Sequence, residues 1–184
     1  MGIAIADEAA KRGAGVILIL GPVDMLPENK AVKVINVLSA REMAGESIKY
    51  FDQCDIAILA AAVADYTPES VSGSKIKKKD REMLIRLKPT LDIAAELGKI
   101  KNEGQILAGF ALETDNELDN ARDKLIRKNL DFIVLNSLRD EGSGFRSDTN
   151  KVTFIDKNNI VEKFELKSKA GVAADIMDEI ETML

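Results

Sequence analysis

The chain has 184 residues, a length that suits one domain, and 46% of them are hydrophobic, enough for a core without help from metals or disulfides. Its 26 lysines and arginines against 31 aspartates and glutamates give a net charge of −5, which offers no general attraction to nucleic acid or to an anionic membrane. The single cysteine, Cys54, excludes an internal disulfide, and the absence of histidine argues against serine-triad hydrolysis and histidine-rich metal sites.

Helices and strands alternate in the first part of the chain. Residues 1–12 place small and branched apolar side chains on one helical face, and Gly13 is suited to end that helix. Apolar runs at 16–20 and 32–38 predict strands, and the capping-box pattern Ser39–Glu42 predicts a helix over 40–51. Because a doubly wound sheet normally opens with a strand, we also expect a strand before residue 1.

The run 56–66 is apolar without alternation and predicts a central strand that is buried on both faces. Small side chains such as Ala61 at its end would let a planar ligand approach the backbone. Asp65 would stand at the carboxyl edge of the sheet, the edge at which open α/β sheets bind ligands. Cys54, just before this strand, is better suited to packing than to nucleophilic chemistry.

A polar, glycine-containing segment, 73–80, follows with four lysines and predicts a mobile basic loop. Residues 83–88 alternate after their first pair and predict a half-exposed strand that pairs with the residues around Ile76. A buried strand, an acid at its end and a basic loop after it together suggest an anionic ligand.

The second half continues the alternation. It predicts a helix at 92–101, a strand at 106–112, a helix at 114–129 opened by a second capping box (Thr114–Glu117), a strand at 131–136, a hairpin of 151–155 with 160–166, and a closing helix at 169–184. The predicted fold class is α/β: a Rossmann-like, mainly parallel sheet flanked by helices, with a C-terminal hairpin and a small extra strand region after the central strand. We expect residues 1–184 to form a single domain.

Chemistry without histidine has to use lysines, carboxylates, amides, backbone groups and a Mg²⁺ ion carried by a phosphate ligand. An NAD-dependent dehydrogenase domain is one alternative, and it would show a glycine-rich turn from a strand into a helix. Gly13-Ala14-Gly15 follows a helix and precedes a strand, which is the opposite order.

Further segments point to a particular family, and the match spans nearly the whole chain: GPV at 21–23, AAVADY at 61–66, KIKK at 75–78, GFALET at 109–114, RKNLD at 127–131 and NKVT at 150–153. In this order and spacing they resemble the bacterial phosphopantothenoylcysteine synthetases of coenzyme A biosynthesis. The resemblance implies a CTP-dependent phosphopantothenate–cysteine ligase. It would activate 4′-phosphopantothenate as an acyl-cytidylate, with Mg²⁺ on the triphosphate, and then form an amide with L-cysteine and release CMP.

The resemblance also assigns site residues. Those at CTP-contacting positions of the family are Ala61, Asp65, Lys75, Phe110, Lys124 and Lys128. Lys75 would additionally act in catalysis by closing over the phosphates. Without the resemblance, Asp65 would be a turn former, Phe110 a core residue, and Lys75 a solvated loop lysine.

Lys124 and Lys128 fall in the last half of the predicted helix, where lysines commonly complement the helix dipole. We expect that end of the helix to point away from the carboxyl edge of the sheet. Asn136 ends a strand at that edge, where it either orients substrate or simply terminates the strand. No protein metal ligand is assigned.

No apolar run reaches membrane-spanning length and no signal-peptide pattern opens the chain, so we expect a cytoplasmic protein. The resemblance further implies a homodimer with residues 83–88 and the basic loop near the subunit contact. It implies a fused or separate flavin-dependent decarboxylase as a partner. It leads us to expect a strand and a glycine-containing loop before Met1, with a functional asparagine there. A non-catalytic nucleotide-binding module remains an alternative, because CTP contacts could survive without that segment.

Overall fold

Within the residues that this computed structural model describes, 1–78, 82–113, 115–137 and 148–184, the main sheet has five strands. Its strand order is β10-β9-β7-β6-β3, with β3 (Ile56–Leu59), β6 (Ile106–Glu113), β7 (Phe132–Ser137), β9 (Val152–Asp156) and β10 (Val161–Lys163). The strands β3, β6 and β7 run parallel, whereas β9 and β10 form the predicted antiparallel hairpin at the other end of the sheet.

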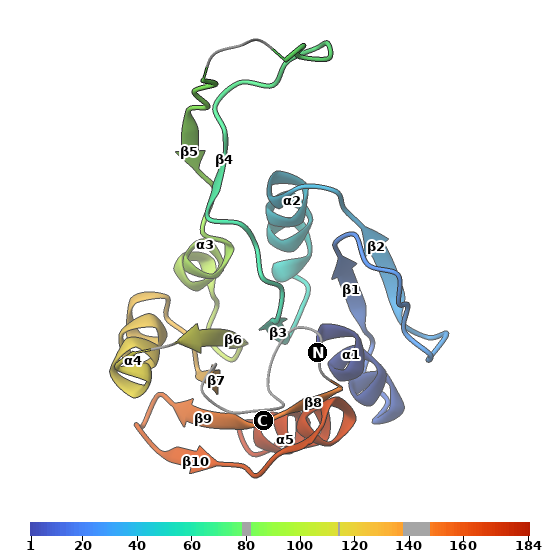
Figure 1. Ribbon diagram of the computed structural model, residues 1–184. Helices are drawn as coiled ribbons and strands as arrows, with labels where there is room; N and C mark the ends of the chain where they lie inside the picture. The colour runs from blue at the N-terminus through green and yellow to red at the C-terminus, as the bar shows by residue number, and fades with distance from the viewer. Residues whose placement is uncertain (79–81, 114, 138–147) are drawn as a thin grey trace.

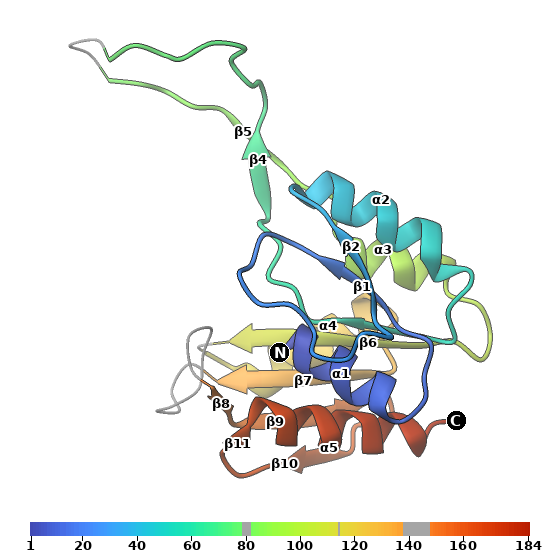
Figure 2. The same cartoon turned by 90° about the vertical axis from the view of Figure 1, so that its right-hand side faces the viewer.

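Helices cover both faces of this sheet, as Figures 1 and 2 show. One face packs against α1 (Gly2–Lys11) and α5 (Lys169–Glu181), and the other against α2 (Ala40–Phe51), α3 (Ile93–Ile100) and α4 (Glu117–Arg127). The alternate residues of β6 divide between the two apolar clusters, Ile106 and Ala108 facing α5, and Leu107 and Ala111 facing α3 and α4. This three-layer arrangement confirms the predicted α/β fold class.

Several helix starts follow the predicted capping chemistry. The Ser39 hydroxyl accepts a hydrogen bond from the Glu42 N–H at 3.2 Å, and the Asp92 carboxylate accepts one from the Ala95 N–H at 3.1 Å. The capping box predicted at 114–117 is wrong. Helix α4 begins at Glu117 behind Asn116, which has a left-handed φ of 45° and makes no side-chain cap, while Thr114 lies outside the described residues.

The prediction of a central strand over 56–66 is wrong in two respects. Strand β3 ends at Leu59, and its position in the main sheet is an edge, next to β6 alone. Its residues are therefore only half-buried, whereas β6 and β7 form the buried centre. The alanines after Leu59 carry little apolar area, and the chain leaves the sheet there instead of extending the strand.

Two small sheets lie beside the main one. Strands β1 (Ile17–Leu20) and β2 (Lys33–Asn36) pair in parallel next to α1 and α2, and the short strands β8 (Thr149–Asn150) and β11 (Lys167–Ser168) pair antiparallel. Strand β2 is thus shorter than the predicted run 32–38. In the part of the chain that the structure describes, no helix combines the length and apolar character needed to cross a membrane.

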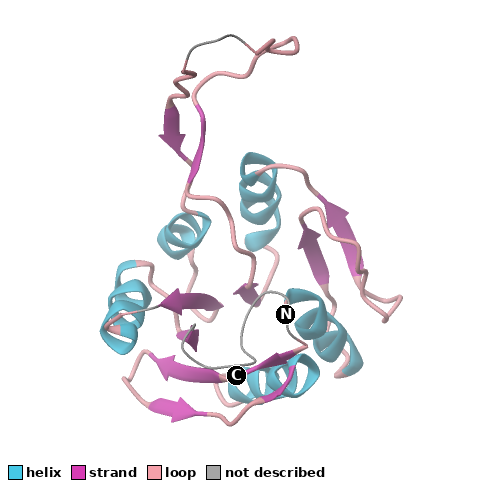
Figure 3. Ribbon diagram, viewed as in Figure 1, coloured by secondary structure: helices cyan, strands magenta, loops and turns pink. Residues whose placement is uncertain are grey.

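A two-stranded arm, described for residues 66–78 and 82–89, extends away from the helices and the main sheet (Figure 3). It consists of β4 (Tyr66–Pro68) and β5 (Leu87–Pro89), which pair antiparallel, and of the loops between them. The prediction that 83–88 forms a strand paired with the residues around Ile76 is wrong, because the strand covers only 87–89 and its partner is 66–68. The described side chains at 71–78 and 82–89 are exposed, so nothing in the core fixes a longer ladder.

Candidate functional site

The carboxyl ends of β3, β6 and β7 meet at one edge of the sheet, as parallel strands require. Ala61 and Asp65 lie there, both exposed, in the segment that joins β3 to the arm. Phe110 lies in β6, one residue beyond the last β3–β6 pair, and is half-buried against the cluster under α1 and α5. Asn136 lies near the end of β7, opposite Leu112 of β6. The structure therefore brings these four predicted residues to one edge.

Helix α1 also begins at this edge. A Cβ atom built on Gly2 would lie 3.7 Å from the Cβ atom of Ala60, the residue that follows β3. The first turn of α1 therefore packs against the end of β3, with its backbone N–H groups at the edge that carries the predicted site residues.

The side chain of Lys124 reaches this edge, although the residue lies in the last half of α4. Its Nζ lies 2.5 Å from an Oε atom of Glu113, the last residue of β6. A helical side chain leans toward the start of its helix, which brings this ammonium back along α4 to the strand end. The Lys124 ammonium has three N–H donors, so a nucleotide phosphate could bind it beside the Glu113 carboxylate or in place of that carboxylate.

Lys128 pairs with a different carboxylate. Its Nζ lies 3.0 Å from Asp92, the residue that caps α3 directly after the arm. Burial opposes ionisation of Asp92, but the hydrogen bond from the Ala95 N–H and the ion pair with Lys128 outweigh it, so the pKa of Asp92 is lowered. Lys128 thus links the end of α4 to the start of α3.

Lys75 is not brought near the other candidates. It lies in the part of the arm beyond the β4–β5 ladder, it is exposed, and the arm leads away from the ends of β3 and β6 in both views of the molecule (Figures 1 and 2). The predicted role of this lysine therefore requires either a movement of the arm or a second copy of the chain.

Sequence reasoning missed Asn150 as a site candidate. This residue is only 3% exposed, and its Oδ1 atom and that of Asn136 are buried and have no hydrogen-bond partner within the described structure. Asn136 lies opposite Val152, so both amides belong to the same edge, where β7 ends and β9 begins. An unpartnered buried carbonyl is costly, so ligand N–H or O–H donors would be favourable partners. The polar pair Asn150-Lys151 directly before the apolar strand was the available signal.

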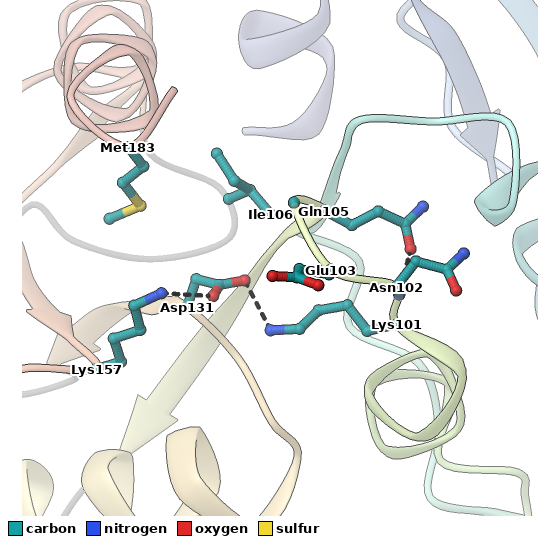
Figure 4. Close-up of a pocket in the computed structure, with 9 residues that line it drawn as sticks. Lys101, Asn102, Glu103, Gln105, Ile106, Asp131, Lys157 and Met183 are labelled. Atoms are coloured by element: carbon teal, nitrogen blue, oxygen red, sulfur yellow. Dashed lines mark hydrogen bonds and ion pairs between the residues drawn. The ribbon is translucent and has the colours of Figure 1, made fainter.

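Two cavities in the described part of the structure lie away from this edge. One, of about 250 Å³, lies at the opposite end of β6 and is lined by Lys101, Asp131, Lys157 and their neighbours (Figure 4). The other, of about 490 Å³, lies along β2 and α2. Among the described residues, no group of three or more Cys, Asp or Glu side chains is placed to hold a metal ion.

Comparisons with known proteins agree with the fold and the sequence pattern. The family model of the DNA/pantothenate metabolism flavoprotein C-terminal domain matches residues 1–184. The chain is 59% identical over 184 residues to the "Cysteine/Cysteine sulfinic acid decarboxylase" of an unknown prokaryotic organism, covering 100% of this chain and 51% of that protein. It is 44% identical over 180 residues to the "Coenzyme A biosynthesis bifunctional protein CoaBC" of Bacillus subtilis (strain 168), covering 98% of this chain and 44% of that protein.

A solved structure is similar over nearly the whole chain. The crystal structure of the C-terminal domain of a coenzyme A biosynthesis bifunctional protein CoaBC superposes with a TM-score of 0.83 at 36% identity, covering 99% of this chain and 81% of that one. The chain thus spans about half the length of the curated relatives that it matches and most of this solved domain.

Proposed function

Because the chain belongs to the family of DNA/pantothenate metabolism flavoprotein C-terminal domains, we propose that it acts in coenzyme A biosynthesis as a CTP-dependent phosphopantothenate–cysteine ligase. The observation that carries the proposal is the meeting of Ala61, Asp65 and Phe110 at the carboxyl edge of the parallel strands. These residues belong to the segments whose order and spacing resemble the synthetases. The likeness to the CoaBC protein and to the CoaBC C-terminal domain supports the same assignment.

In the proposed reaction a carboxylate of 4′-phosphopantothenate attacks the α-phosphate of CTP, and diphosphate leaves. The amine of L-cysteine then attacks the acyl carbon, an amide bond forms, the amine loses a proton, and CMP leaves. Both steps rely on positioning and on neutralisation of negative charge, which suits a chain without histidine. The oxygens of Asp65 would accept hydrogen bonds from the ribose hydroxyls, and the small side chain of Ala61 would admit the cytosine ring.

The remaining candidates have complementary roles. Phe110 would pack against the nucleotide, and Asn136 would orient the acyl substrate through its unpartnered amide oxygen. Lys124 and Lys128 would bind phosphate oxygens beside the carboxylates of Glu113 and Asp92 or in place of them. Carboxylate partners of this kind keep lysines in place before the anion arrives.

A Mg²⁺ ion would accompany the triphosphate and neutralise part of its charge. The protein's own residues would then bind the phosphates and the sugar, while the metal keeps most of its ligands from water and phosphate oxygens.

Nucleotide binding by the 184-residue chain is the direct test, measured by calorimetry. We expect CTP to bind more tightly than ATP, and Asp65→Asn to weaken CTP binding about tenfold, equivalent to about 1.4 kcal/mol. Asp24→Asn, which alters an exposed aspartate in the loop after β1, is the matched control and should not change the affinity. Equal affinity for CTP and ATP, or an unchanged Asp65→Asn variant, would overturn the proposed site.

Release of CMP from CTP and 4′-phosphopantothenate separates a ligase from a non-catalytic nucleotide-binding module. In an active preparation, Lys75→Gln should lower turnover roughly a hundredfold. A lysine that acts where charge develops mainly stabilises the transition state, so its loss raises the activation barrier. Its melting temperature should be unchanged, since Lys75 is exposed and lies outside the ladder of the arm. Normal turnover of this variant would make Lys75 an ordinary surface lysine.

We also propose that the protein forms a homodimer through the arm. Large apolar side chains are exposed along its second half: Met83, Leu84, Ile85 and Leu87. Exposed apolar residues gathered on a projecting strand are typical of a surface that another chain covers. A second copy would also offer a way to bring Lys75 to a sheet edge that its own arm does not approach.

Sedimentation of Leu84→Asp tests the dimer. Leu84 is 89% exposed, so aspartate should not disturb the fold, but it should dissociate the dimer. The control is Leu38→Asp, which places the same charge on a leucine that is 81% exposed and lies between β2 and α2, outside the arm. A monomeric parent protein, or equal behaviour of the two variants, would contradict the arm as the interface.

A flavin-dependent decarboxylase, fused or separate, is the proposed functional partner. The support is the decarboxylase name of the 59% identical relative, in which this chain matches 51% of the length. The remaining length of that relative is where the decarboxylase would lie.

A further inference from the structure

Thr90 makes two hydrogen bonds at the point where the arm joins the body of the protein. Its backbone N–H donates to the carbonyl oxygen of Asp65 at 2.9 Å, and its hydroxyl donates to the carbonyl oxygen of Ala64 at 2.6 Å. A single residue therefore binds two consecutive peptide groups on the opposite side of the arm.

Hydrogen-bonded and non-hydrogen-bonded pairs alternate along the ladder of the arm. In β4–β5 Tyr66 lies opposite Pro89, and Pro68 lies opposite Leu87. The bond from the Thr90 N–H lies just inside these pairs, so both prolines occupy non-hydrogen-bonded positions, where a missing N–H removes no ladder bond. Thr90 therefore continues the ladder at its inner end and adds a side-chain hydrogen bond to it. Beyond its outer end, the N–H of Glu69 donates to the carbonyl oxygen of Arg86 at 3.0 Å.

Thr90 also connects the arm to the rest of the candidate site. Two residues later, Asp92 caps α3 and pairs with Lys128. The stretch 90–92 thus holds the backbone of Asp65 at one end and the end of α4 at the other. Asp65 is exposed and follows a coil segment, so the described structure gives its backbone little other support.

We propose that Thr90 is a positioning residue for nucleotide binding. Its two hydrogen bonds fix the backbone of Ala64 and Asp65, and thereby aim the Asp65 carboxylate at the nucleotide ribose. They also set the direction in which the arm leaves the sheet. This inference rests on the proposed function for the role of Asp65, whereas the backbone contacts themselves are independent of it.

The test compares Thr90→Val, which keeps the side-chain shape and removes the hydroxyl, with Thr90→Ser, which keeps the hydroxyl. Thr67→Val is the matched control, because Thr67 lies in the same ladder and its side chain makes no hydrogen bond with the described residues. Hydrogen exchange of the Thr90 amide is measured without ligand, and the dissociation constant of CTP is measured by calorimetry.

Thr90→Val should speed exchange of the residue-90 amide and weaken CTP binding, each about fivefold, the effect of one net hydrogen bond. Thr90→Ser and Thr67→Val should behave like the parent protein, with melting temperatures unchanged in all variants.

Unchanged exchange in Thr90→Val would overturn the contact. Faster exchange with unchanged CTP affinity would overturn the positioning role. If the parent protein does not bind CTP, the proposed function and the positioning role both fail, and the exchange data still decide whether Thr90 holds the arm.

Discussion

Single side chains at the carboxyl edge have structural partners as well as proposed ligands. The resemblance predicts that Lys124 and Lys128 contact the nucleotide, and in the structure each is paired with a carboxylate, Glu113 or Asp92. Sequence position indicates that a lysine is present, but the partner comes from another element and depends on the packing of α3, α4 and β6. The two roles are compatible, because an ion pair that is partly exposed is weak enough to exchange.

Asp92 provides a prediction about pH. Because its pKa is lowered in the folded protein, its contribution to stability is fully present above the ordinary aspartate pKa of about 3.9 and is lost as the pH falls through the folded value. The side-chain amide of an Asp92→Asn variant would still cap α3 but could not ionise. Between pH 7 and pH 2 the melting temperature of the parent should therefore fall by a few degrees more than that of the variant.

Asp24→Asn is the control for this pH series, since Asp24 is an exposed loop residue. Its melting temperatures should follow those of the parent protein at every pH. If Asp92→Asn also follows the parent, then the Asp92–Lys128 pair does not stabilise the fold.

Cys54 should react slowly with alkylating reagents. Burial, and next the negative charge of Asp55, raises the pKa of its thiol, so little thiolate is present at neutral pH. Alkylation by iodoacetamide near neutral pH, followed by mass spectrometry, should be slower than for a free cysteine and should accelerate in Asp55→Asn. Reaction as fast as that of free cysteine in the folded protein would instead indicate an activated thiol.

At the scale of elements, the sequence predicted the features that depend on residues close together in the chain. The caps at Ser39 and Asp92 and the C-terminal hairpin are where hydrogen-bonding side chains and alternation place them. The errors come from tertiary context. The long apolar run after Asp55 predicts a buried strand, but β3 has one neighbour in the main sheet and its alanine-rich end becomes coil. The partner of β5 could not be predicted either, because short exposed strands carry no burial pattern.

Gly98 and Gly45 form a matched pair of helical glycines with opposite expectations. A Cβ atom on Gly98 of α3 would lie 2.0 Å from the carbonyl oxygen of Lys128, whereas one on Gly45 of α2 would have no neighbour within 4 Å. Gly98→Ala should lower the free energy of unfolding by about 3 kcal/mol, because backbone has to move. Gly45→Ala should raise it by about 0.5–1 kcal/mol through helix propensity.

Urea unfolding measures both variants. The close approach at Gly98 exists because α3 packs on the turn after α4, where Asn129 adopts a left-handed φ of 52° and donates to the Gly98 carbonyl at 2.8 Å. Equal effects of the two substitutions would mean that α3 and this turn are not held together as described.

At the scale of the whole molecule, the sequence predicted the fold class and the meeting of several candidate residues at one edge of the sheet. It did not predict the projecting arm, which places Lys75 far from those residues. Alternation of apolar runs with helical patterns specifies layers, and parallel strands place Asp65 and Asn136 at one edge. The arm projects because its residues have no core to join, and a sequence does not state in which direction an exposed segment leaves the sheet.

The opposite end of the sheet depends on Asp131, which is 6% exposed and joins three segments distant in the sequence. Its carboxylate accepts hydrogen bonds from the Leu107 N–H of β6 at 2.8 Å and from Lys101 after α3 at 2.9 Å, and it also contacts Lys157 after β9 at 3.4 Å. The cavity in Figure 4 is lined by these charged residues. Their contacts with one another give the polar lining a structural role in joining the segments.

Asp131→Asn should therefore destabilise the whole protein. The amide would be neutral, and Lys101, whose side chain is only 12% exposed, would lose its counter-charge. Breaking a buried pair by neutralising one partner costs about 3 kcal/mol, which urea unfolding would detect as an earlier midpoint with an unchanged slope. Lys157→Gln is the control. Its side chain is 66% exposed and its contact is longer, so it should cost less than about 1 kcal/mol. If both substitutions cost the same, the charge of Asp131 does not hold these segments together, and the Leu107 N–H bond alone accounts for its burial.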